Sequence, residues 1–523
     1  MKKIIMFIVA GALSTAVFAG GLLTNTNQNV RFLRNPARNA STDIDAVFSN
    51  PAGLAFMEHN GFTLSLNNQS AFQTRTINST FAPFAMNGGS ETKEYKGTTT
   101  AWFVPSVQAA YKTDRWVFSG SFAIVGGGGS LKFDQGLPSF EGLFAGSIAQ
   151  LSNAAHIPTT YSLNMNLEGT SITYGAQLGV TYKISDMFSA FVGGRASFVG
   201  NGYKGYLNNV KIDKSNELIT YFTVAATTAT QAAGALQPAI DNGAGSYPAS
   251  AVLTPDLIAA MAAGLGMSTQ DFGKLTISDI QKAFNMLAAQ ANGAVAGINQ
   301  LISTDVALDT KQLGWGIAPI LGFDFKYDNL LIALKYDFKT NITLKNKTAK
   351  DIKIPGVIPN GMYPDGAESR YDIPALLSAG VSYKFFDKKL TASVGSHIFF
   401  DKNAKMTNNR QDSLKNNTFE WLAGLEYRIN KTFLISAGGQ ISRSGLTDGM
   451  QSDMNFNLNS SSIGFGGEIN ITDRLSLNLA YLFTMYKKYT NNHPSYANKI
   501  NPAKEEVYNR SNKAFGIALD YKF

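Results

Sequence analysis

The chain has 523 residues, no Cys, 49 Gly, 35 Phe and 21 Tyr, and only 16% of its residues are charged. The absence of Cys excludes a disulfide scaffold, a thiolate zinc site, a thiol nucleophile and an acylated lipoprotein Cys. A mean hydropathy of −0.06 is too polar for a bundle of membrane helices, the aromatic content is too high for a disordered chain, and a diffuse charge of +8 is no nucleic-acid footprint.

The N-terminus has the organisation of a cleaved export signal. Lys2 and Lys3 form a basic region, residues 4–13 are apolar, and small residues precede a cleavage site after Ala19. The apolar run is short for a spanning helix of ~20 residues, and no later stretch is long enough for one. We therefore expect residues 1–19 to be removed, and the exported chain to be periplasmic, secreted or a β-barrel.

Residues 20–60 begin the exported chain and are too irregular for a pair of strands. From the residues alone they suit a plug inside a barrel, a periplasmic tail or a disordered leader.

Residues 61–523 contain fourteen segments in which large apolar side chains alternate with small or polar ones. In residues 514–523 every second side chain, from Phe515 to Phe523, is large and apolar, which is typical of a strand with one greasy face. The segments with the clearest alternation are ~9–12 residues long, the length that a tilted strand needs to cross a bilayer. The predicted strands are 62–76, 100–112, 116–126, 171–183, 187–200, 312–326, 330–346, 371–384, 389–401, 417–429, 432–443, 459–471, 474–487 and 514–523.

The connections between these segments alternate in length. Six are short turns, most of them rich in Asp and Asn, and every other connection is long, with the longest at residues 201–311. Periplasmic turns and extracellular loops of a barrel with an even number of strands give this alternation. Tyr and Trp near segment ends, such as Tyr111 and Trp421, fit interfacial girdles. We predict an all-β fold, a 14-stranded antiparallel transmembrane β-barrel.

The long extracellular insertion at about 201–311 is predicted to be partly helical. Thr254-Pro255-Asp256 resembles a helix start, and Thr276 precedes a second amphipathic run that extends to about Leu301. These helices are rich in Met. They suit either a lid that packs on itself or an apolar extracellular basin, and the sequence does not separate the two.

Segment 39–55 reads NASTDIDAVFSNPAGLA. Its Asp45-Ala46 element, followed by Asn50-Pro51-Ala52, resembles the N-terminal hatch of the FadL family of outer-membrane long-chain fatty-acid transporters. Segments 371–385 and 336–348 are similar to strands of that family, and the family has the same number of strands. A second tripeptide, Asn35-Pro36-Ala37, is present. We favour Asn50, Pro51 and Ala52 as the hatch motif because they follow Asp45 and lie nearer the first strand.

The resemblance implies passive uptake by a monomer in the lipid and lipopolysaccharide of the bacterial outer membrane. A hydrophobic molecule would bind among the extracellular loops, enter the lumen above a hatch at residues 20–60 and leave sideways at a kink in the third strand. The glycine run Gly126, Gly127, Gly128 and Gly129 ends the third predicted strand and is the candidate for that gap, although an ordinary loop start also suits it.

A fatty-acid carboxylate requires a cation or a hydrogen-bond donor. The alternation directs Arg195, Lys335 and Lys339 into the lumen, which makes them candidate partners of the ligand carboxylate. The alternative is that lumenal charges pair among themselves.

Several functions remain open from the sequence. Uptake of long-chain fatty acids leads, and uptake of aromatic hydrocarbons, a scaffold or shuttle for secreted proteins, and a general porin are the alternatives. We expect no enzyme activity, cofactor, metal or nucleic-acid partner. The four His residues include only one in mid-strand, His397, and its neighbour Ser396 would face the opposite side of the sheet.

Overall fold

The computed structural model describes residues 22–353, 360–494 and 504–523, so the predicted signal peptide lies outside the described residues. The chain forms a closed antiparallel barrel of 14 wall strands, which confirms the predicted fold class. Closure is direct, because β1 pairs with β2 on one side and with β17 on the other. The wall strands are β1 (Gly61–Thr80), β2 (Thr92–Lys112), β3 (Trp116–Phe133), β4 (Tyr161–Lys183), β5 (Phe188–Ile212), β6 (Val306–Tyr327), β7 (Leu330–Asp337), β10 (Leu376–Phe385), β11 (Leu390–Phe399), β12 (Thr418–Arg428), β13 (Phe433–Arg443), β14 (Ser460–Asn470), β15 (Leu475–Tyr486) and β17 (Glu505–Lys522).

Three short strands continue the ladder at the end of the barrel that carries the long connections. They are β8 (Thr343–Lys350), β9 (Glu368–Arg370) and β16 (Tyr489–Asn491). Segments 330–346 and 371–384 are therefore not the continuous strands that the sequence predicts. Both neighbouring strands break where Pro374 lies, and Pro has no N–H to donate to a ladder.

Several strands run well past their predicted ends. The pairing of β4 with β5 continues from Lys183 and Ser189 to Tyr161 and Ile212. At the far end of these strands the outward side chains become polar, because lipid no longer faces them, while the inward side chains stay buried. The alternation of apolar and polar side chains ends at that point, although the strands continue. The sequence therefore predicts strands that are shorter than β4 and β5.

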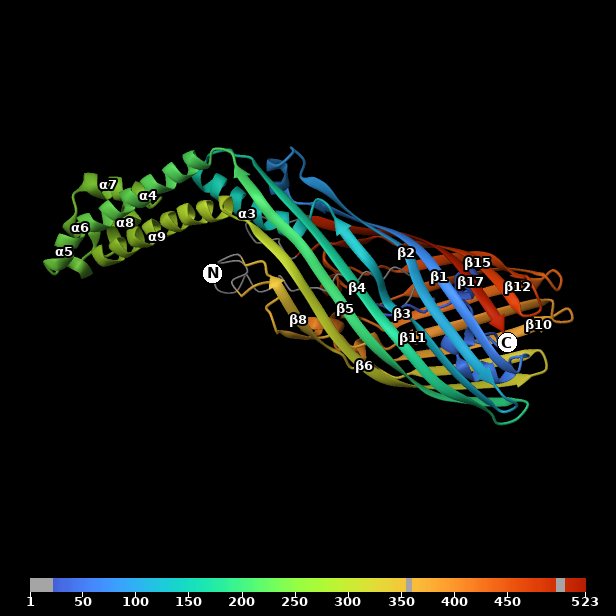
Figure 1. The fold of residues 1–523 in the computed structure, drawn as a ribbon. Helices are drawn as coiled ribbons and strands as arrows, with labels where there is room; N and C mark the ends of the chain where they lie inside the picture. The colour runs from blue at the N-terminus through green and yellow to red at the C-terminus, as the bar shows by residue number, and fades with distance from the viewer. Residues whose placement is uncertain (1–21, 354–359, 495–503) are drawn as a thin grey trace.

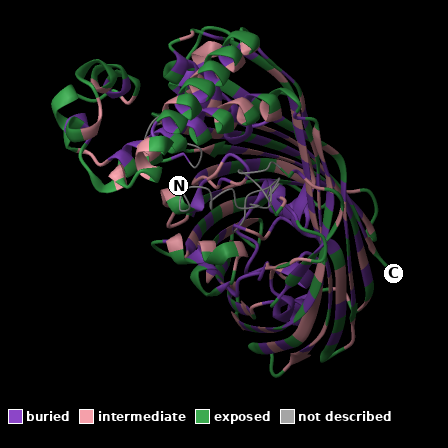
Figure 2. Ribbon diagram, turned by 90° about the vertical axis from the view of Figure 1, so that its left-hand side faces the viewer, coloured by how far each residue is buried: buried purple, intermediate pink, exposed green. Residues whose placement is uncertain are grey.

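Residues 22–57, here called the hatch, lie inside the barrel and are almost all buried. Figure 2 shows these buried segments enclosed by the ring of strands. The hatch contains α1 (Val30–Arg34), α2 (Ala46–Ser49) and the 3-10 helix η1 (Pro51–Phe56).

A helical stalk projects from the end of the barrel opposite the C-terminus (Figure 1). Its two long helices, α4 (Ser215–Ala235) and α9 (Ile277–Ile302), pack side by side, and Gln281 of α9 donates to the carbonyl of Ala233 (3.2 Å). The remaining helices are α3 (Pro138–Ala155), α5 (Gln237–Asp241), α6 (Ala249–Val252), α7 (Pro255–Gly264), α8 (Thr269–Lys274) and the 3-10 helices η2 (Ala82–Met86), η3 (Ala244–Ser246), η4 (Asp401–Asn403), η5 (Thr407–Ser413) and η6 (Asp448–Met450). In the described part of the chain, no helix combines the length and apolar character needed to cross a membrane.

The two predicted helices of the insertion are present as α7 and α9, with Thr254 and Thr276 as their N-caps. Helices α3 and α4 were not predicted. Neither has a side-chain hydrogen bond at its N-cap, and α4 is rich in Thr, a weak helix former. The start signals that are present, Pro138 and Glu141 in α3 and Glu217 in α4, were not used in the prediction.

Candidate functional site

The wall ladder is interrupted between β2 and β3. Pairing runs regularly to Ser106 and Ala123, stops, and resumes only at Thr98 and Lys132. On its other side β3 stays paired with β4, but with register shifts at Ile124/Gly126 and Gly127/Gly129. The structure therefore places the whole glycine run Gly126–Gly129 at the interruption.

The glycines allow this irregular path. The φ angles of Gly127 and Gly128 are +67° and +130°, in the region that L side chains rarely adopt. A Cβ on Gly127 would lie 2.1 Å from the carbonyl oxygen of Ser171. On the β2 side, a bulge directs Trp102 and Phe103 outward, and they are 70% and 72% exposed. Two large rings thus stand on the outer surface beside the interruption.

The hatch occupies the free edge of β3. The backbone N–H of Asn25 donates to the carbonyl of Val125 (2.8 Å), and its side chain donates to the carbonyl of Gly127 (2.8 Å). The side chain of Gln28 donates to the carbonyl of Ile124 (3.0 Å), and Ser106 of β2 donates to the carbonyl of Gln28 (2.6 Å). The hatch thereby replaces part of the missing ladder, and its withdrawal would uncover the gap.

The predicted hatch motif docks on three wall strands. Asn50 caps η1 by accepting from the N–H of Ala52 (3.3 Å) and donates to Asp324 of β6 (2.6 Å). Thr181 of β4 donates to the carbonyl of Pro51 (2.7 Å), and Ser189 of β5 donates to that of Ala52 (2.8 Å). These contacts close the lumen at the end with short turns.

The second tripeptide has the same local geometry. Asn35 accepts from the N–H of Ala37 (3.1 Å), as Asn50 does from that of Ala52. It packs against the wall so closely that a Cβ on Gly424 would lie 1.9 Å from its Oδ1. Both Asn-Pro-Ala segments are therefore turns that the wall holds in place.

Three arginines anchor the hatch to the wall, and the sequence analysis did not single them out. Arg31 forms ion pairs with Asp520 (2.8 Å) and Glu468 (2.7 Å). Arg34 and Arg38 share Glu426 of β12, at 2.9 and 2.7 Å.

Arg38 also holds Asp45, the predicted acidic residue of the hatch, which lies 2.7 Å from its Nε. All three arginines are buried, so the network is shielded from water. The sequence shows that these arginines are three and four residues apart. It does not show which wall carboxylates they meet, because the fold brings those carboxylates together.

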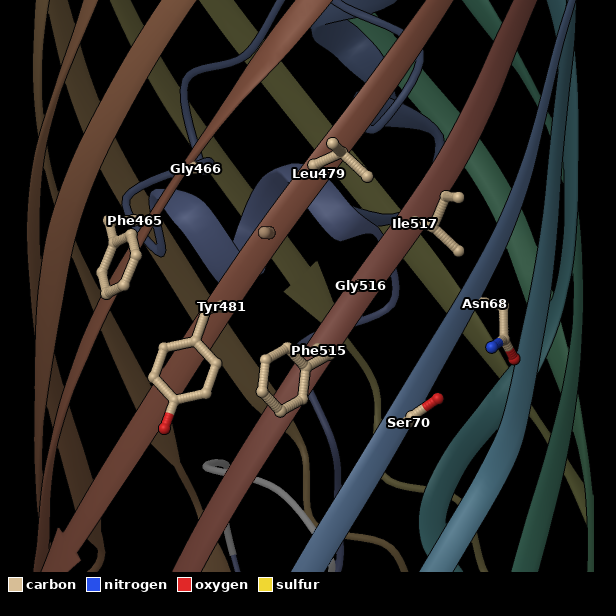
Figure 3. Close-up of a pocket in the computed structure, with 10 residues that line it drawn as sticks. Asn68, Ser70, Phe465, Gly466, Leu479, Tyr481, Phe515, Gly516 and Ile517 are labelled. Atoms are coloured by element: carbon tan, nitrogen blue, oxygen red, sulfur yellow. The ribbon is translucent and has the colours of Figure 1, made fainter.

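Inward-facing glycines of the wall leave room for α1. A Cβ on Gly516 would meet Val30 and Leu33 at 2.8–3.0 Å, and one on Gly464 would lie 1.8 Å from the carbonyl oxygen of Leu33. Figure 3 shows this part of the wall from outside, with the hatch behind it. A shallow outer groove of about 380 Å³ lies there, between the rings of Phe465, Tyr481 and Phe515 and the polar β1 residues Asn68 and Ser70.

Two of the three predicted carboxylate partners lie together. Arg195 and Lys335 form ion pairs with opposite oxygens of Asp337, at 2.9 and 3.0 Å. Both cations lie over the ring of Phe48 in the hatch, 4.7 and 5.1 Å from its centroid. The cavity beside them holds about 30 Å³, room for one water molecule and no ligand while the hatch is in this position.

Lys339 is elsewhere. Its Nζ lies 3.5 Å from Asp372 and 3.3 Å from the carbonyl of Asn403, on the rim of the barrel. In this conformation all three candidate residues therefore have a carboxylate of the protein as partner, Asp337 for Arg195 and Lys335 and Asp372 for Lys339.

His397 pairs with a carboxylate that the sequence does not reveal. Its Nδ1 lies 2.8 Å from Glu420 on the neighbouring strand, and Gln440 donates to the other oxygen of Glu420 (2.6 Å). Ser396 faces the other side and donates to the backbone carbonyl of Glu420 (3.0 Å). The pair is buried between neighbouring wall strands, with His397 6% and Glu420 0% exposed.

A large apolar cluster fills the end of the barrel nearest the stalk. It combines wall residues such as Ile77 and Phe133 with Phe140 and Phe144 of α3 and with Phe222 of α4. The stalk helices pack on each other, and Phe222 near the base of α4 is part of this apolar cluster, here called the apolar basin.

These features define a fourteen-stranded barrel with a lumenal hatch and an interrupted wall. No sequence-family model matches the chain, and no curated protein matches its sequence. Solved structures do. A Pseudomonas aeruginosa FadL homologue is 14% identical, with a TM-score of 0.59 and coverage of 96% of this chain and 100% of that chain.

The toluene transporter TodX of P. putida is also 14% identical, with a TM-score of 0.50 and coverage of 92% of this chain and 95% of that chain. A deltaS2S3 mutant of TodX, described as a monoaromatic hydrocarbon channel, has a TM-score of 0.51 at 14% identity and covers 95% of this chain and 99% of that chain. The chain therefore has the FadL-like fold, and the resemblance seen in the sequence is confirmed at the level of the fold.

Proposed function

We propose that this protein resides in the bacterial outer membrane and mediates the passive uptake of hydrophobic molecules, with long-chain fatty acids as the leading substrate. The observation that carries the proposal is the interrupted β2–β3 ladder, whose free edge is occupied by hatch residues rather than by wall. A barrel with a continuous wall would not need hatch residues at the edge of a wall strand. A route that opens sideways into lipid explains why they are there.

The proposed route has three steps. The ligand first binds in the apolar basin formed by α3, the base of the stalk and the wall. It then enters the lumen as the hatch segment around Asn25 and Gln28 leaves the edge of β3. It finally passes between β2 and β3 into the membrane, beside the exposed rings of Trp102 and Phe103.

A lateral exit is favoured over the periplasmic mouth by hydration. Each CH₂ group that moves from an apolar site into water costs about 0.8 kcal/mol, so a fifteen-methylene tail would cost roughly 12 kcal/mol. The mouth is also closed, because hatch residues such as Val47 and Leu54 are fully buried against Ala110 and Val117 of the wall. The membrane side offers an apolar environment throughout.

The fold supports two substrate classes, since solved proteins of this fold carry the names of a FadL homologue and of a toluene transporter. A scaffold for secreted proteins would not need a lumenal path that an apolar molecule can follow. Catalysis is not part of the proposal.

The proposal is tested by tethering the hatch. The Nδ2 of Asn27 in the hatch donates to the Oε1 of Gln69 in β1 (2.8 Å), and the chain contains no Cys. In the Asn27→Cys/Gln69→Cys variant, a short bis-methanethiosulfonate forms a disulfide with each thiol and so joins the hatch to the wall. We expect this cross-linking to abolish uptake of a labelled long-chain fatty acid by cells that lack another transporter, and a reductant, which cleaves the two disulfides, to restore it.

The matched control places two cysteines at the short-turn end, Lys431→Cys and Asn470→Cys, where the side chain of the half-buried Asn470 donates to the carbonyl of the exposed Lys431 (2.7 Å). Cross-linking this pair should leave uptake unchanged. Uptake at the untethered rate by a fully cross-linked hatch variant would contradict the proposed route.

A further inference from the structure

The outer surface of the barrel carries three close lysines at the stalk end of β6 and β8 (Figure 1). Lys311 of β6 and Lys347 of β8 are directly opposite residues of the two strands, so their side chains leave the same face of the sheet. Lys345 lies two residues along β8 on that face, about 7 Å away along the strand. All three side chains are exposed. These three residues are here called the lysine patch.

The lysine patch has no partner within the described part of the chain. None of its ammonium groups takes part in an ion pair or a side-chain hydrogen bond there, whereas Lys339 and Arg370 on the same rim both pair with Asp372 (3.5 and 2.6 Å). Like charges directly opposite each other in a sheet are destabilising, and Lys311 and Lys347 are such a pair. The patch is therefore a cationic surface that an external anion would stabilise.

Nearby carboxylates do not neutralise this surface. Glu368 of β9 is directly opposite the first lysine of the patch in β8. Asp309 of β6 is opposite two further exposed lysines, Lys350 of β8 and Lys204 of β5, and Glu168 of β4 is opposite Lys204 on the other side. Five lysines thus stand against three carboxylates, and the opposed lysine pair of the patch has no carboxylate across either ladder.

The lysine patch begins where the apolar band of the wall ends. On the outward face of β6, Lys311 is followed by Leu313, Trp315 and Ile317, which are all exposed. Large apolar side chains on the outside of a barrel face lipid, and Trp is enriched where lipid meets the head groups. The stalk end carries the long connections, which we expect outside the cell. The patch therefore lies at the level of the head groups of the outer leaflet.

The wall beside the patch is recessed. Gly200 and Gly202 of β5 are directly opposite Leu313 and Lys311, so they share the outward face with them. A Cβ on either glycine would meet no atom nearer than 3.9 Å, so space is open above the backbone there. A bulky polar group can lie on these glycines while its anionic substituents reach the lysines.

We infer that the lysine patch, with the recess at Gly200 and Gly202, is a docking site for the phosphorylated sugar head group of one lipopolysaccharide molecule. Its phosphates accept from the ammonium groups, its sugars lie over the glycines, and its acyl chains follow the apolar face below Lys311. This inference rests on the outer-membrane location in the proposed function and goes beyond it, because it assigns a fixed lipid to one side of the barrel.

The test is equilibrium binding to the purified, detergent-solubilised protein. The probes are lipid A with two phosphates, the same lipid A after removal of both phosphates, phosphatidylglycerol and inorganic phosphate. Each lysine beside an anionic lipid head group contributes about 5-fold in affinity. We therefore expect Lys311→Gln/Lys347→Gln to bind phosphorylated lipid A roughly 10- to 30-fold more weakly than the wild type, and to bind the dephosphorylated form as the wild type does.

The control variant is Lys389→Gln/Lys431→Gln, which makes the same change of charge at exposed positions of the short-turn end and should bind every probe as the wild type does. Lys311→Arg/Lys347→Arg keeps both charges and should keep the affinity for phosphorylated lipid A within a few-fold. The heat-dependent shift in electrophoretic mobility of folded barrels verifies that each variant is folded, and the comparison of the two forms of lipid A in the wild type requires no variant.

Three outcomes would overturn the inference. One is equal binding of the two forms of lipid A by the wild type, or unchanged binding of phosphorylated lipid A by Lys311→Gln/Lys347→Gln. Another is an equal loss of phosphatidylglycerol binding in that variant, which would assign the patch to anionic lipids in general. The third is displacement of lipid A by inorganic phosphate at constant ionic strength, which would assign it to a free anion.

Uptake of a labelled long-chain fatty acid separates the inference from the proposed function. The lysine patch lies outside the proposed route, so Lys311→Gln/Lys347→Gln should take up the fatty acid at the wild-type rate. Absence of uptake by the wild type would count against the proposed function and leave the lipid A result standing. Loss of the preference for phosphorylated lipid A would overturn the inference and leave uptake standing.

Discussion

Glu426 is the wall carboxylate on which the hatch depends most, so its neutralisation should loosen the hatch. It accepts from Arg34 at 2.9 Å and from Arg38 at 2.7 Å, and all three residues are buried. Removing one partner of a buried ion pair costs about 3–5 kcal/mol. Arg38 keeps Asp45 at 2.7 Å, whereas the remaining carboxylate of Arg34, Glu468, is 3.7 Å away. For Glu426→Gln we therefore expect the lower end, about 3 kcal/mol, which raises the population of the displaced hatch roughly 100-fold.

Hydrogen exchange of the hatch amides measures this change directly. Amides of α1 and of the turn after it should exchange about 100-fold faster in Glu426→Gln, while amides of the wall strands keep their rates. The matched control is Glu91→Gln, because Glu91 pairs with Lys504 at 2.7 Å but both side chains are about half exposed. Its effect should be below about 1 kcal/mol. Unchanged exchange of the hatch in Glu426→Gln would refute the view that these ion pairs hold it.

Three further outcomes are expected. Gly127→Ala should destabilise the barrel by roughly 1–3 kcal/mol, because φ at Gly127 is +67°. Gly200→Ala is the control and should have almost no effect, because its Cβ would meet only Leu313, at 3.9 Å. Equal midpoints of urea unfolding for the two variants would contradict this expectation. Thr276→Ala should cost α9 about 1 kcal/mol and speed exchange of the Asp279 amide, which now donates to Thr276 (3.2 Å); an unchanged rate would count against the cap. Burial raises the pKa of Asp401 to about 7, so its folded carboxyl keeps a proton that the unfolded one releases above a pH of about 4. That stabilisation is lost as the pH rises through about 7, and thermal unfolding of Asp401→Asn between pH 4 and 8 should lack this decline.

The barrel could be predicted because lipid acts on every wall strand in the same way. Alternating apolar side chains reveal each strand wherever lipid covers one face, as in residues 514–523. The pattern ends where lipid ends, so the outer parts of β4 and β5 were missed. Pro374 interrupts two strands at once, because the neighbouring strand loses its hydrogen-bond partners at the same point. The alternation pattern of one strand does not show such a break in its neighbour.

The site was harder to predict because its contacts cross the chain. The Asn50 turn could be found, since a cap and a Pro are local. The wall carboxylates that pair with Arg31, Arg34 and Arg38 lie hundreds of residues away in sequence. Arg195 and Lys335 are buried in the structure, but their shared ion pairs with Asp337 and their contact with the ring of Phe48 depend on the fold. The glycine run was visible in the sequence, whereas the hatch segment around Asn25 and Gln28 that contacts the edge of β3 was not.

The central claim is that an apolar ligand leaves the lumen between β2 and β3. The most direct measurement is photo-cross-linking of a long-chain fatty acid that carries a diazirine near its methyl end, followed by mass spectrometry of the labelled peptides. We predict adducts on the β3 edge from Ile124 to Leu131 and on Trp102 and Phe103. Adducts confined to the short-turn mouth, around Leu54 and Met57, would show that the ligand leaves through the hatch end and would contradict the account.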